Sequence, residues 1–497
     1  MPCRLSSSMA RCRFPTTGTR RQAELRSVPD ALFNPQSVAV IGATEGASAT
    51  GAPRLGAAAL AHLVEHGFPG AVYPVNPNRA EIMGLRAYAG IEAVPGPVDL
   101  ALIVLPAAAC VEAMAACARS NVKAAVVFSS GFGEAGDTAL EAALVSAAGG
   151  RVRFCGPNTA GLVSVHARLA ASISMVCQFN PFRAGDIAFV TQSGALGGSM
   201  LGRGMEEGVG FSHWVSTGNE ADLDLADYVD ALAGDPGVGL FALFVEGLRD
   251  VGKFRAACRK AANAGKPVLV YKTGRSDVAA AAAASHTGAL AGSDRAFDAL
   301  CRQDGLIRVD DAADLLPTAL AFSRLRHKLP RGRRIGIVSA SGGICGVAAD
   351  DCARFGLDIP ELSGETQARL RSVLPDFAAV RNPVDVTGQV RSSPTGYQDT
   401  VRAVLDDDGI DGVLLLVTMA GEPRASFYGR EIPALAADSD KPLLVGWTGA
   451  VSLAQEGHPM LKASGVPTFP SSSAAVKAMR ALADYAAFQG RSGADRR

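Results

Sequence analysis

The chain is short of the features that mark membrane proteins, secreted disulfide scaffolds and nucleic-acid-binding proteins. Its 48 Lys and Arg residues match 48 Asp and Glu residues, so it has no net charge to attract nucleic acid or an anionic membrane. The longest apolar runs, such as 413–417, are far too short to cross a bilayer. Its 10 cysteines include no C-x-x-C pair and no Cys/His cluster at zinc-ligand spacing. We therefore expect a soluble cytoplasmic protein with reduced cysteines, no metal ligands, and no nucleic-acid or membrane partner.

One common catalytic motif and one common cofactor-binding motif are also missing. A serine-hydrolase elbow needs a glycine two residues before the serine, but threonine or serine stands there in both Ser-Gly turns, at Ser193 and Ser341. The turn after the first apolar run, 42–48, lacks the central glycine of G-x-G-x-x-G, and 76–79 carry no acid to hold a ribose hydroxyl. Acyl-serine chemistry and NAD binding are therefore disfavoured.

What the chain does contain is a repeated alternation of short apolar runs with alanine-rich stretches. The alternation begins at 37 and restarts at 186 and 334, and a length of 497 residues suits about three domains. Uninterrupted apolar runs separated by helices are typical of parallel sheets covered on both faces. We therefore predict an α/β fold of three doubly wound parallel-sheet domains.

The predicted domain boundaries follow changes in composition. The first domain covers 31–170, the second 171–328 and the third 334–488, with a basic linker containing Pro and Gly between the last two. The start of the segment 1–30 carries several arginines and serines without an acid, which leaves a transit peptide open, but no apolar core of a secretion signal follows. A disordered tail or an over-long start is the preferred interpretation, and 489–497 is a second tail.

Segments 186–198 and 334–346 share one design: an apolar run, a Ser-Gly turn and the start of a helix. Such a turn leaves free backbone N–H groups and a partial positive charge at the helix N-terminus, which favours an anion. Tight-turn geometry alone explains one such glycine, but two matched turns favour phosphate sites. These would comprise Ser193 and Gly194 in one turn, and Ser341, Gly342 and Gly343 in the other. Cys345, in the first turn after them, is a less favoured candidate for a reactive thiol of lowered pKa.

His286 lies between short polar residues, directly after the alanine run 279–284. A histidine in that setting is on a mobile loop and can accept a phosphoryl group, although a plain surface histidine fits the same pattern. Glu246 ends the apolar run 240–245 and could orient an imidazole by accepting its N–H, or could cap the next helix. Arg79 follows the second apolar run and could meet a phosphate, or could be a solvated loop residue.

Six segments carry a resemblance to one known family: 33–43, 73–77, 156–158, 190–197, 285–293 and 381–385. They resemble the α subunit of NDP-forming (ADP-forming) acyl-CoA synthetases, in the succinyl-CoA synthetase superfamily, over about 32–487. The resemblance implies a Rossmann-like CoA-binding domain followed by two flavodoxin-like CoA-ligase domains, with His286 as the phosphohistidine and Glu246 steadying its ring. It places phosphate at the two Ser-Gly turns, and coenzyme A against Gly42, Ala43, Thr44, Glu45, Gly46, Ala47, Asn76, Pro77, Arg79, Ser129, Ser130 and Gly131.

The same resemblance implies a reaction and a partner. Acyl-CoA, phosphate and ADP would be interconverted with a carboxylic acid, CoA and ATP through an acyl phosphate and the phosphohistidine. The family also needs an ATP-grasp domain for ADP or ATP and Mg²⁺, for which three sheet units leave no room, so we expect a separate β subunit in a heterotetramer. The small carboxylic acid, such as acetate, is left open by the sequence. The alternative is a divergent CoA-binding or carbamoyl/acyl-transfer protein on the same scaffold, without ligase activity.

Overall fold

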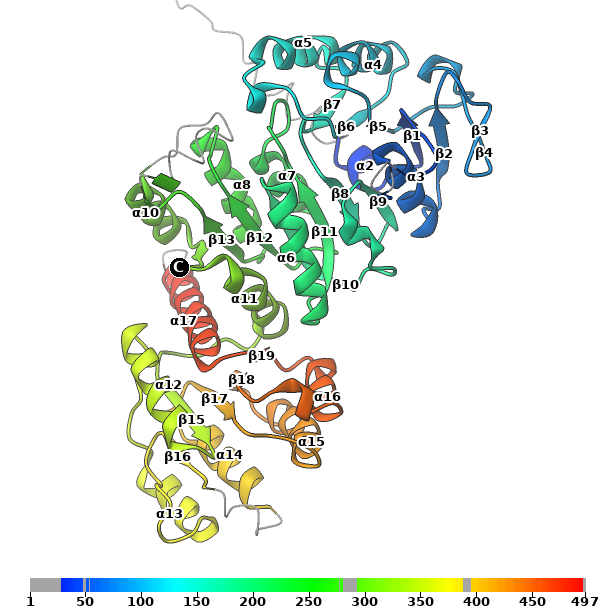
Figure 1. The fold of residues 1–497 in the computed structure, drawn as a ribbon. Helices are drawn as coiled ribbons and strands as arrows, with labels where there is room; N and C mark the ends of the chain where they lie inside the picture. Colours follow the sequence, from blue (N-terminus) through cyan, green and yellow to red (C-terminus); the bar gives the residue numbers. More distant parts are fainter. Residues whose placement is uncertain are drawn as a thin grey trace, which may run out of the picture.

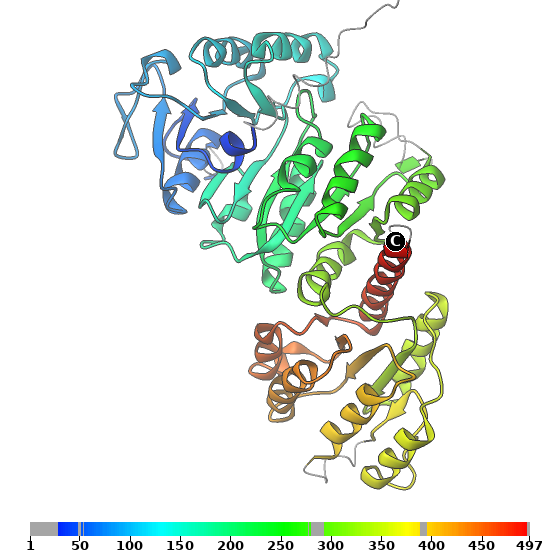
Figure 2. The ribbon, with the colours of Figure 1, turned by 180° about the vertical axis from the view of Figure 1, so that it is seen from behind.

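The computed structural model describes residues 28–47, 51–52, 54–276, 278–279, 293–387 and 395–494. Three main sheets follow one another along the chain, each flanked by helices, and Figures 1 and 2 show the resulting units in an elongated arrangement. The predicted α/β fold class is confirmed. Within the described residues, no helix is both long and apolar enough to span a membrane.

The first unit is a parallel five-stranded sheet of order β2-β1-β5-β6-β7. Strands β1, β5 and β6 are buried at every position, as the apolar runs predict, because helices cover both faces of the sheet. Helices α2 and α3 pack on one face, and α4 and α5 on the other. The elements are α2 (Val28–Phe33), β1 (Ser37–Ile41), α3 (Leu55–Glu65), β2 (Ala71–Val75), β3 (Glu81–Ile82), β4 (Leu85–Arg86), η1 (Ile91–Ala93), β5 (Leu100–Ile103), α4 (Ala107–Arg119), β6 (Ala124–Val127), η2 (Gly133–Ala135), α5 (Thr138–Ala148) and β7 (Arg153–Cys155).

The second unit is a seven-stranded sheet of order β14-β13-β12-β10-β11-β8-β9. It is parallel from β14 to β11, whereas β8 pairs antiparallel with both β11 and β9. Its elements are β8 (Gly161–Ser164), β9 (Leu169–Ser172), η3 (Met175–Gln178), β10 (Ala184–Thr191), α6 (Gly194–Glu206), β11 (Phe211–Ser216), α7 (Leu225–Leu232), β12 (Leu240–Val245), α8 (Val251–Asn263), β13 (Val268–Lys272), α10 (Asp294–Asp304), β14 (Ile307–Arg308) and α11 (Ala312–Leu325).

The hairpin of β8 and β9 differs from the sequence expectation in two ways. The expected first-domain boundary at 170 falls inside β9, so this hairpin belongs to the second sheet, and its antiparallel pairing departs from a purely parallel sheet. Helix α3 of the first unit packs on β9, and the ring Nδ1 of His62 lies 2.8 Å from the carbonyl oxygen of Ser172. The first two units consequently share one continuous apolar core.

The third unit is a parallel five-stranded sheet of order β16-β15-β17-β18-β19. Strands β15, β17 and β18 are buried throughout. Its elements are β15 (Ile335–Ser339), α12 (Gly342–Arg354), α13 (Gly364–Val373), β16 (Val384–Asp385), α14 (Gly396–Asp406), β17 (Gly412–Val417), α15 (Arg424–Ala437), β18 (Leu443–Trp447), η5 (Val451–Leu453), α16 (Gly457–Ser464), β19 (Thr468–Phe469) and α17 (Ser472–Ala494).

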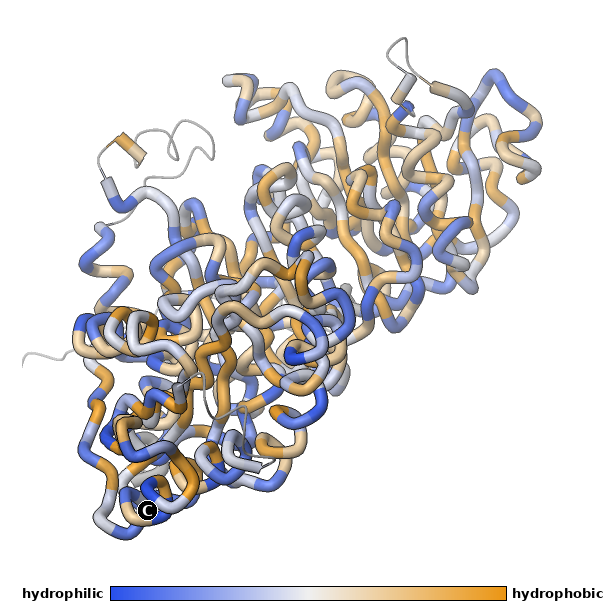
Figure 3. The backbone as a smooth tube through the Cα atoms, turned by 60° about the horizontal axis from the view of Figure 1, so that its bottom comes forward, coloured by the Kyte–Doolittle hydropathy of each residue, from blue (hydrophilic) through white to orange (hydrophobic). Residues whose placement is uncertain are grey.

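Helix α17 joins the third unit to the second. It packs against α12 of its own unit and against α11 of the second unit, and Lys477 Nζ lies 2.7 Å from Asp314 Oδ2 of α11. The helix extends to Ala494, so the tail expected from 489 begins inside it. Val476, Met479 and Leu482 of α17 are buried in the core, and Figure 3 shows hydrophobic segments in the interior and hydrophilic ones in many outer turns. The second and third units are therefore in direct contact through one long helix.

Candidate active site

Two neighbouring cavities lie at the carboxyl edge of the first sheet. The first-unit pocket, about 670 Å³, is bounded by the ends of β1 and β2 and by α4. The interunit groove, about 850 Å³, runs between the first and second units. The two cavities share Gly42, Thr44, Val104 and Leu105 in their walls. The carboxyl ends of parallel strands are where doubly wound folds bind ligands, so the location alone marks a candidate site.

The turn after β1 is shaped by glycine and by an unpartnered hydroxyl. Gly42 has a φ of +89°, and a Cβ there would lie 2.2 Å from the carbonyl oxygen of Val104, so no other residue fits. Asn76 Nδ2 donates to the carbonyl oxygen of Ala43 at 2.8 Å and holds the turn against the end of β2. Thr44 Oγ1 is buried and has no hydrogen-bond partner among the described residues, although Thr44 lines both cavities. A ligand in either cavity would therefore find a free hydroxyl.

Only some of the other residues expected to contact coenzyme A line one of the two cavities. Pro77 lines the first-unit pocket, and Ser129 and Ser130 line the interunit groove, where the Ser129 hydroxyl donates to the carbonyl oxygen of Leu105. The remaining residues expected there lie outside the described lining of both cavities: Ala43, Glu45, Gly46, Ala47, Arg79 and Gly131. Arg79 is exposed, as a solvated loop arginine would be.

Helix α6 directs its N-terminus into the interunit groove. Ser193 caps the helix, because its Oγ accepts a hydrogen bond from the Leu196 N–H at 3.4 Å, and Ser193 and Gly194 both line the groove. A Cβ on Gly197 would lie 2.4 Å from Thr191 Cγ2, so glycine lets the first turn of α6 pack closely on the end of β10. The free N–H groups and the positive end of the helix dipole make this wall favourable to an anion.

Gln192 holds Glu246, the residue expected to orient His286. The sequence analysis did not identify this role of Gln192. Its Oε1 accepts hydrogen bonds from the backbone N–H groups of Glu246 at 2.5 Å and Gly247 at 3.0 Å. Its Nε2 donates to the carbonyl oxygen of Gly247 at 2.8 Å. Glu246 itself is 9% exposed at the carboxyl end of β12. These hydrogen bonds tie the end of β12 to the turn that begins α6. In the sequence, this contact is indicated only by the polar residue between β10 and Ser193.

A polar bridge joins the second unit to the first beside the groove. The Asn219 side-chain amide donates to Glu141 Oε2 at 2.9 Å and to Glu134, both of the first unit. Arg249 donates to the Asn219 carbonyl oxygen at 2.5 Å, and Asn219 lines the groove. Nothing in the sequence signals this bridge, because the amide and its two carboxylate partners are 78 and 85 residues apart.

Glu220, next to this bridge, is a buried carboxyl group. The Thr217 hydroxyl and the Leu225 N–H donate to its Oε1 at 2.9 and 3.0 Å. Burial nevertheless raises the pKa of Glu220 from 4.5 to about 7, because the charged form loses its hydration. The loop after β11 therefore carries a group that titrates near neutral pH beside the groove.

The second Ser-Gly turn lies elsewhere. Ser341 precedes α12 in the third unit and makes no side-chain cap, and the described lining of the interunit groove includes no residue of that unit. The structure therefore does not bring the two turns together in this cavity. His286 lies outside the described residues. For Cys345, burial raises the pKa of the thiol to about 12, which is opposite to the lowered pKa that a helix N-terminus would give.

Comparison with known proteins places these features in a family. Three protein-family models match in succession: a CoA binding domain over 36–164, a succinyl-CoA ligase like flavodoxin domain over 184–322 and a Ligase-CoA domain over 335–489. The chain is 34% identical to the α subunit of ADP-forming acetate–CoA ligase II of Pyrococcus furiosus, over 92% of this chain and 98% of that protein. It is 35% identical to ADP-forming acetate–CoA ligase I of Archaeoglobus fulgidus, over 91% of this chain and 63% of that protein.

A solved structure agrees with these matches. The dinucleotide-forming acetyl-coenzyme A synthetase 1 of Ca. Korarchaeum cryptofilum, in complex with phosphate and ADP, aligns with a TM-score of 0.83 and 32% identity, covering 93% of this chain and 97% of that chain. These matches to ligases do not favour the alternative of a relative without ligase activity. The chain belongs to the family of ADP-forming acyl-CoA ligase α subunits, within the succinyl-CoA ligase superfamily.

Proposed function

We propose that this chain is the α subunit of an acid–thiol ligase that interconverts acyl-CoA, phosphate and ADP with a carboxylic acid, CoA and ATP. The observation that carries the proposal is the interunit groove. There the CoA-domain turn with Gly42 and Thr44 faces the same space as the Ser193-led end of α6. A thioester held by the first unit would thereby meet an anion held by the second.

The first-unit pocket and the groove together suit coenzyme A. Gly42 leaves the backbone of the turn open to a ligand, and the buried Thr44 hydroxyl offers a hydrogen bond on the wall that both cavities share. Arg54 lines the groove and supplies a cation for phosphoryl oxygens, whereas Arg119 of the pocket is paired with Glu92 and Glu112. We assign the nucleotide end of CoA to the pocket and its thiol end to the groove.

The end of α6 supplies the charge stabilisation for acyl transfer. A phosphate oxygen attacks the thioester carbonyl, the C–S bond breaks, and CoA leaves as the thiolate to give an acyl phosphate. The Gly194 N–H and the helix terminus that Ser193 caps stabilise the negative charge that phosphate carries through this step. This chemistry asks the protein mainly for positioning and electrostatic stabilisation.

His286 then takes the phosphoryl group. One ring nitrogen attacks phosphorus, the P–O bond to the acyl group breaks, and the carboxylate leaves. Glu246 accepts the N–H of the other ring nitrogen and keeps the attacking nitrogen unprotonated. The hydrogen bonds from the Gln192 side chain to Glu246 and Gly247, which we call the Gln192 clamp, support this role. They fix the backbone of Glu246 directly behind the α6 turn.

A separate ATP-grasp subunit in the cytoplasm would complete the enzyme, as a heterotetramer that binds ADP or ATP with Mg²⁺. Two facts support this: the Pyrococcus relative is itself an α subunit, and the Archaeoglobus relative extends well beyond the length that this chain matches. The acid is a small carboxylic acid, and acetate is the first candidate because the relatives are acetate–CoA ligases.

The test is thioester formation from ATP, CoA and a panel of acids. The chain with an ATP-grasp partner subunit should form thioester, and the chain alone should not. Ser193→Ala should lower turnover by tenfold or more, because it loosens the cap that positions the phosphate-binding N–H groups. Ser199→Ala is the matched control on the same helix, since that exposed hydroxyl donates only to the Ala195 carbonyl oxygen, at 3.1 Å. Robust activity of the chain alone, or none from the pair with every acid, would refute the proposal.

A further inference from the structure

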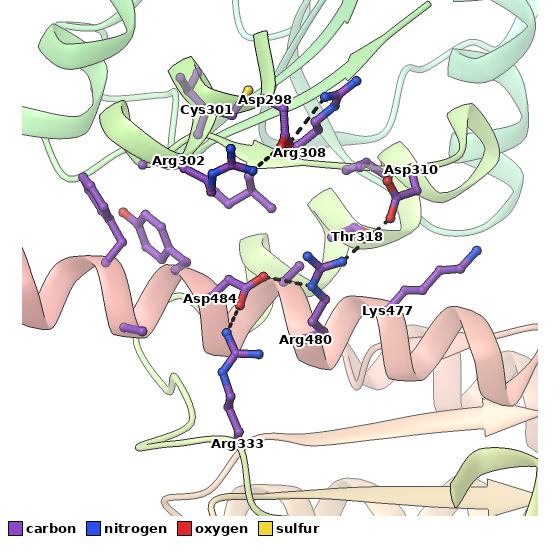
Figure 4. Close-up of a pocket in the computed structure, with 18 of the residues that line it drawn as sticks. Asp298, Cys301, Arg302, Arg308, Asp310, Thr318, Arg333, Lys477, Arg480 and Asp484 are labelled. Carbon is purple, nitrogen blue, oxygen red and sulfur yellow. Dashed lines mark hydrogen bonds and ion pairs between the residues drawn. The ribbon is translucent and has the colours of Figure 1, made fainter. Parts of the chain in front are cut away.

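A separate cavity, which we call the arginine pocket, lies where the second unit meets α17. It has a volume of about 400 Å³ and is bounded by α10 and β14 on one side and by α17 on the other (Figure 4). Arg333, from the linker between the second and third units, completes its wall. Its lining shares no residue with the interunit groove or the first-unit pocket. It is thus distinct from the site proposed for acyl transfer.

The lining of the arginine pocket holds more positive than negative charge. Its basic residues are Arg302, Arg308, Arg333, Lys477, Arg480 and Arg491, and its acidic residues are Asp298, Asp310 and Asp484. Carboxylates just outside the lining compensate two of the cations, since Asp314 pairs with Lys477 and Asp294 with Arg308. The six cations therefore exceed these five carboxylates by one positive charge.

Each acidic residue of the lining is shared between two cations. Asp484 pairs with Arg333 and with Arg480, the latter at 3.0 Å. Asp310 lies 3.7 Å from Arg480 and 3.1 Å from Arg275. Figure 4 shows Arg333 and Arg480 converging on Asp484 from opposite sides. Because one carboxylate serves two guanidinium groups, both retain N–H donors for an added anion.

Arg308 lines the same cavity and has one buried donor without a partner among the described residues. Its side chain is 11% exposed, and its Nε is buried without a hydrogen-bond partner among the described residues. Its guanidinium carbon lies 5.5 Å from the centre of the Phe297 ring, which fixes the plane of the group. A buried donor without a partner is rare in a folded protein, and a bound anion is one way to satisfy it.

The rest of the wall is apolar and partly aromatic. Leu306, Ile307, Ala481, Tyr485 and Phe488 line the cavity. Gly305 makes room for one of these rings, since a Cβ there would lie 2.1 Å from Phe488 Cε1. Guanidinium groups bind phosphoryl oxygens, and an apolar wall with aromatic rings accepts a planar base. The volume is in the range of small-molecule sites.

We propose that the arginine pocket binds a nucleoside diphosphate, with its phosphates on Arg308, Arg333 and Arg480 and its base against the apolar wall. The bound molecule would contact α10, β14, the linker and α17 at once, and so hold the third unit against the second. This inference does not depend on the proposed ligase activity.

The test is calorimetric titration of the full chain with ADP in the presence of saturating CoA, which occupies any nucleotide site in the first unit. ADP should bind to wild type, and Arg480→Ala should weaken binding at least tenfold. Asp484→Asn should tighten binding several-fold, because it releases two guanidinium groups from a competing carboxylate. Arg371→Ala is the matched control, since this exposed arginine of α13 contacts Gln367 and should leave binding unchanged.

Further ligands separate the parts of the proposal. Pyrophosphate should bind more weakly than ADP, and adenosine more weakly still. Equal binding of pyrophosphate and ADP would overturn the assignment of the base to the apolar wall. Absence of ADP binding, or equal ADP binding by wild type and Arg480→Ala with unchanged melting curves, would overturn the site itself. If the ion pairs are only structural, Asp484→Asn will lower the melting temperature without tightening ADP binding, and that result also overturns the proposal.

Discussion

Replacing Gln192 by leucine should destabilise the second unit by about 3 kcal/mol. The side chain is 7% exposed and makes three hydrogen bonds to the peptide groups of Glu246 and Gly247. Leucine fills a similar volume but leaves two N–H groups and one carbonyl without partners, each at a cost of about 1–3 kcal/mol. Because Gln192 borders the groove, water reaches some of these groups, so we use the lower end of that range.

The two tryptophans of the chain make the assay specific. Trp214 lies on β11 of the second unit and Trp447 on β18 of the third, so Trp447→Phe leaves a fluorescence signal from the second unit alone. The background substitution lies in the third unit and is present in both proteins that are compared, so its own effect cancels from the difference. Urea unfolding followed by Trp214 fluorescence then gives the change in free energy of unfolding from the shifted midpoint.

Gln367→Leu is the control for this measurement. It removes two hydrogen bonds in the third unit, one to the Leu362 carbonyl oxygen and one from Arg371, and should leave the Trp214 transition in place. The Gln192→Leu variant should also lose thioester formation in the complete enzyme, because Glu246 is no longer held behind α6. If the Trp214 transition of the Gln192→Leu variant coincides with that of the Trp447→Phe parent, the Gln192 clamp does not stabilise the second unit.

Three further predictions concern single groups. Glu220→Gln should gain stability relative to wild type by about 3 kcal/mol between pH 5 and pH 8. The folded-state pKa of Glu220 lies above its ordinary value, so the contribution of Glu220 to stability is fully present below pH 4.5 and is lost as the pH rises through about 7; a pH-independent difference in urea unfolding would contradict this. Thr44→Val should weaken CoA binding by about tenfold in calorimetry without lowering the melting temperature, since the buried hydroxyl has no partner to lose; equal affinity would remove Thr44 from the CoA site. Cys345 should resist iodoacetamide at pH 8 in the folded chain, because burial raises its pKa to about 12, and rapid alkylation of its peptide by mass spectrometry would contradict the buried geometry.

The parts of the fold that the sequence predicted are those with strong local signals. The fully buried strands, such as β12 and β17, appear as uninterrupted apolar runs, and the Ser193 turn is recognisable because Ser-Gly follows such a run. The hairpin of β8 and β9 was missed because its short strands include serine, alanine and glycine, and their place in the second sheet depends on packing against α3.

The parts of the site that the sequence could not predict depend on contacts between distant segments. Gln192 meets the Glu246 N–H across 54 residues, and Asn219 meets Glu134 across 85, so neither contact has a local pattern. The match between the two Ser-Gly turns was a true repeat of local structure, since each precedes a 13-residue helix. This match could not predict where the third unit lies relative to the second, because that placement depends on α17 and the linker.

The central claim is that His286 carries the phosphoryl group between the groove and the partner subunit. The most direct measurement is incubation of the full chain with radiolabelled acetyl phosphate, followed by peptide mapping of the label. The account predicts an acid-labile, alkali-stable label on the peptide that contains His286, reduced in Ser193→Ala and absent in His286→Asn of unchanged melting temperature. The same label retained in His286→Asn would contradict it.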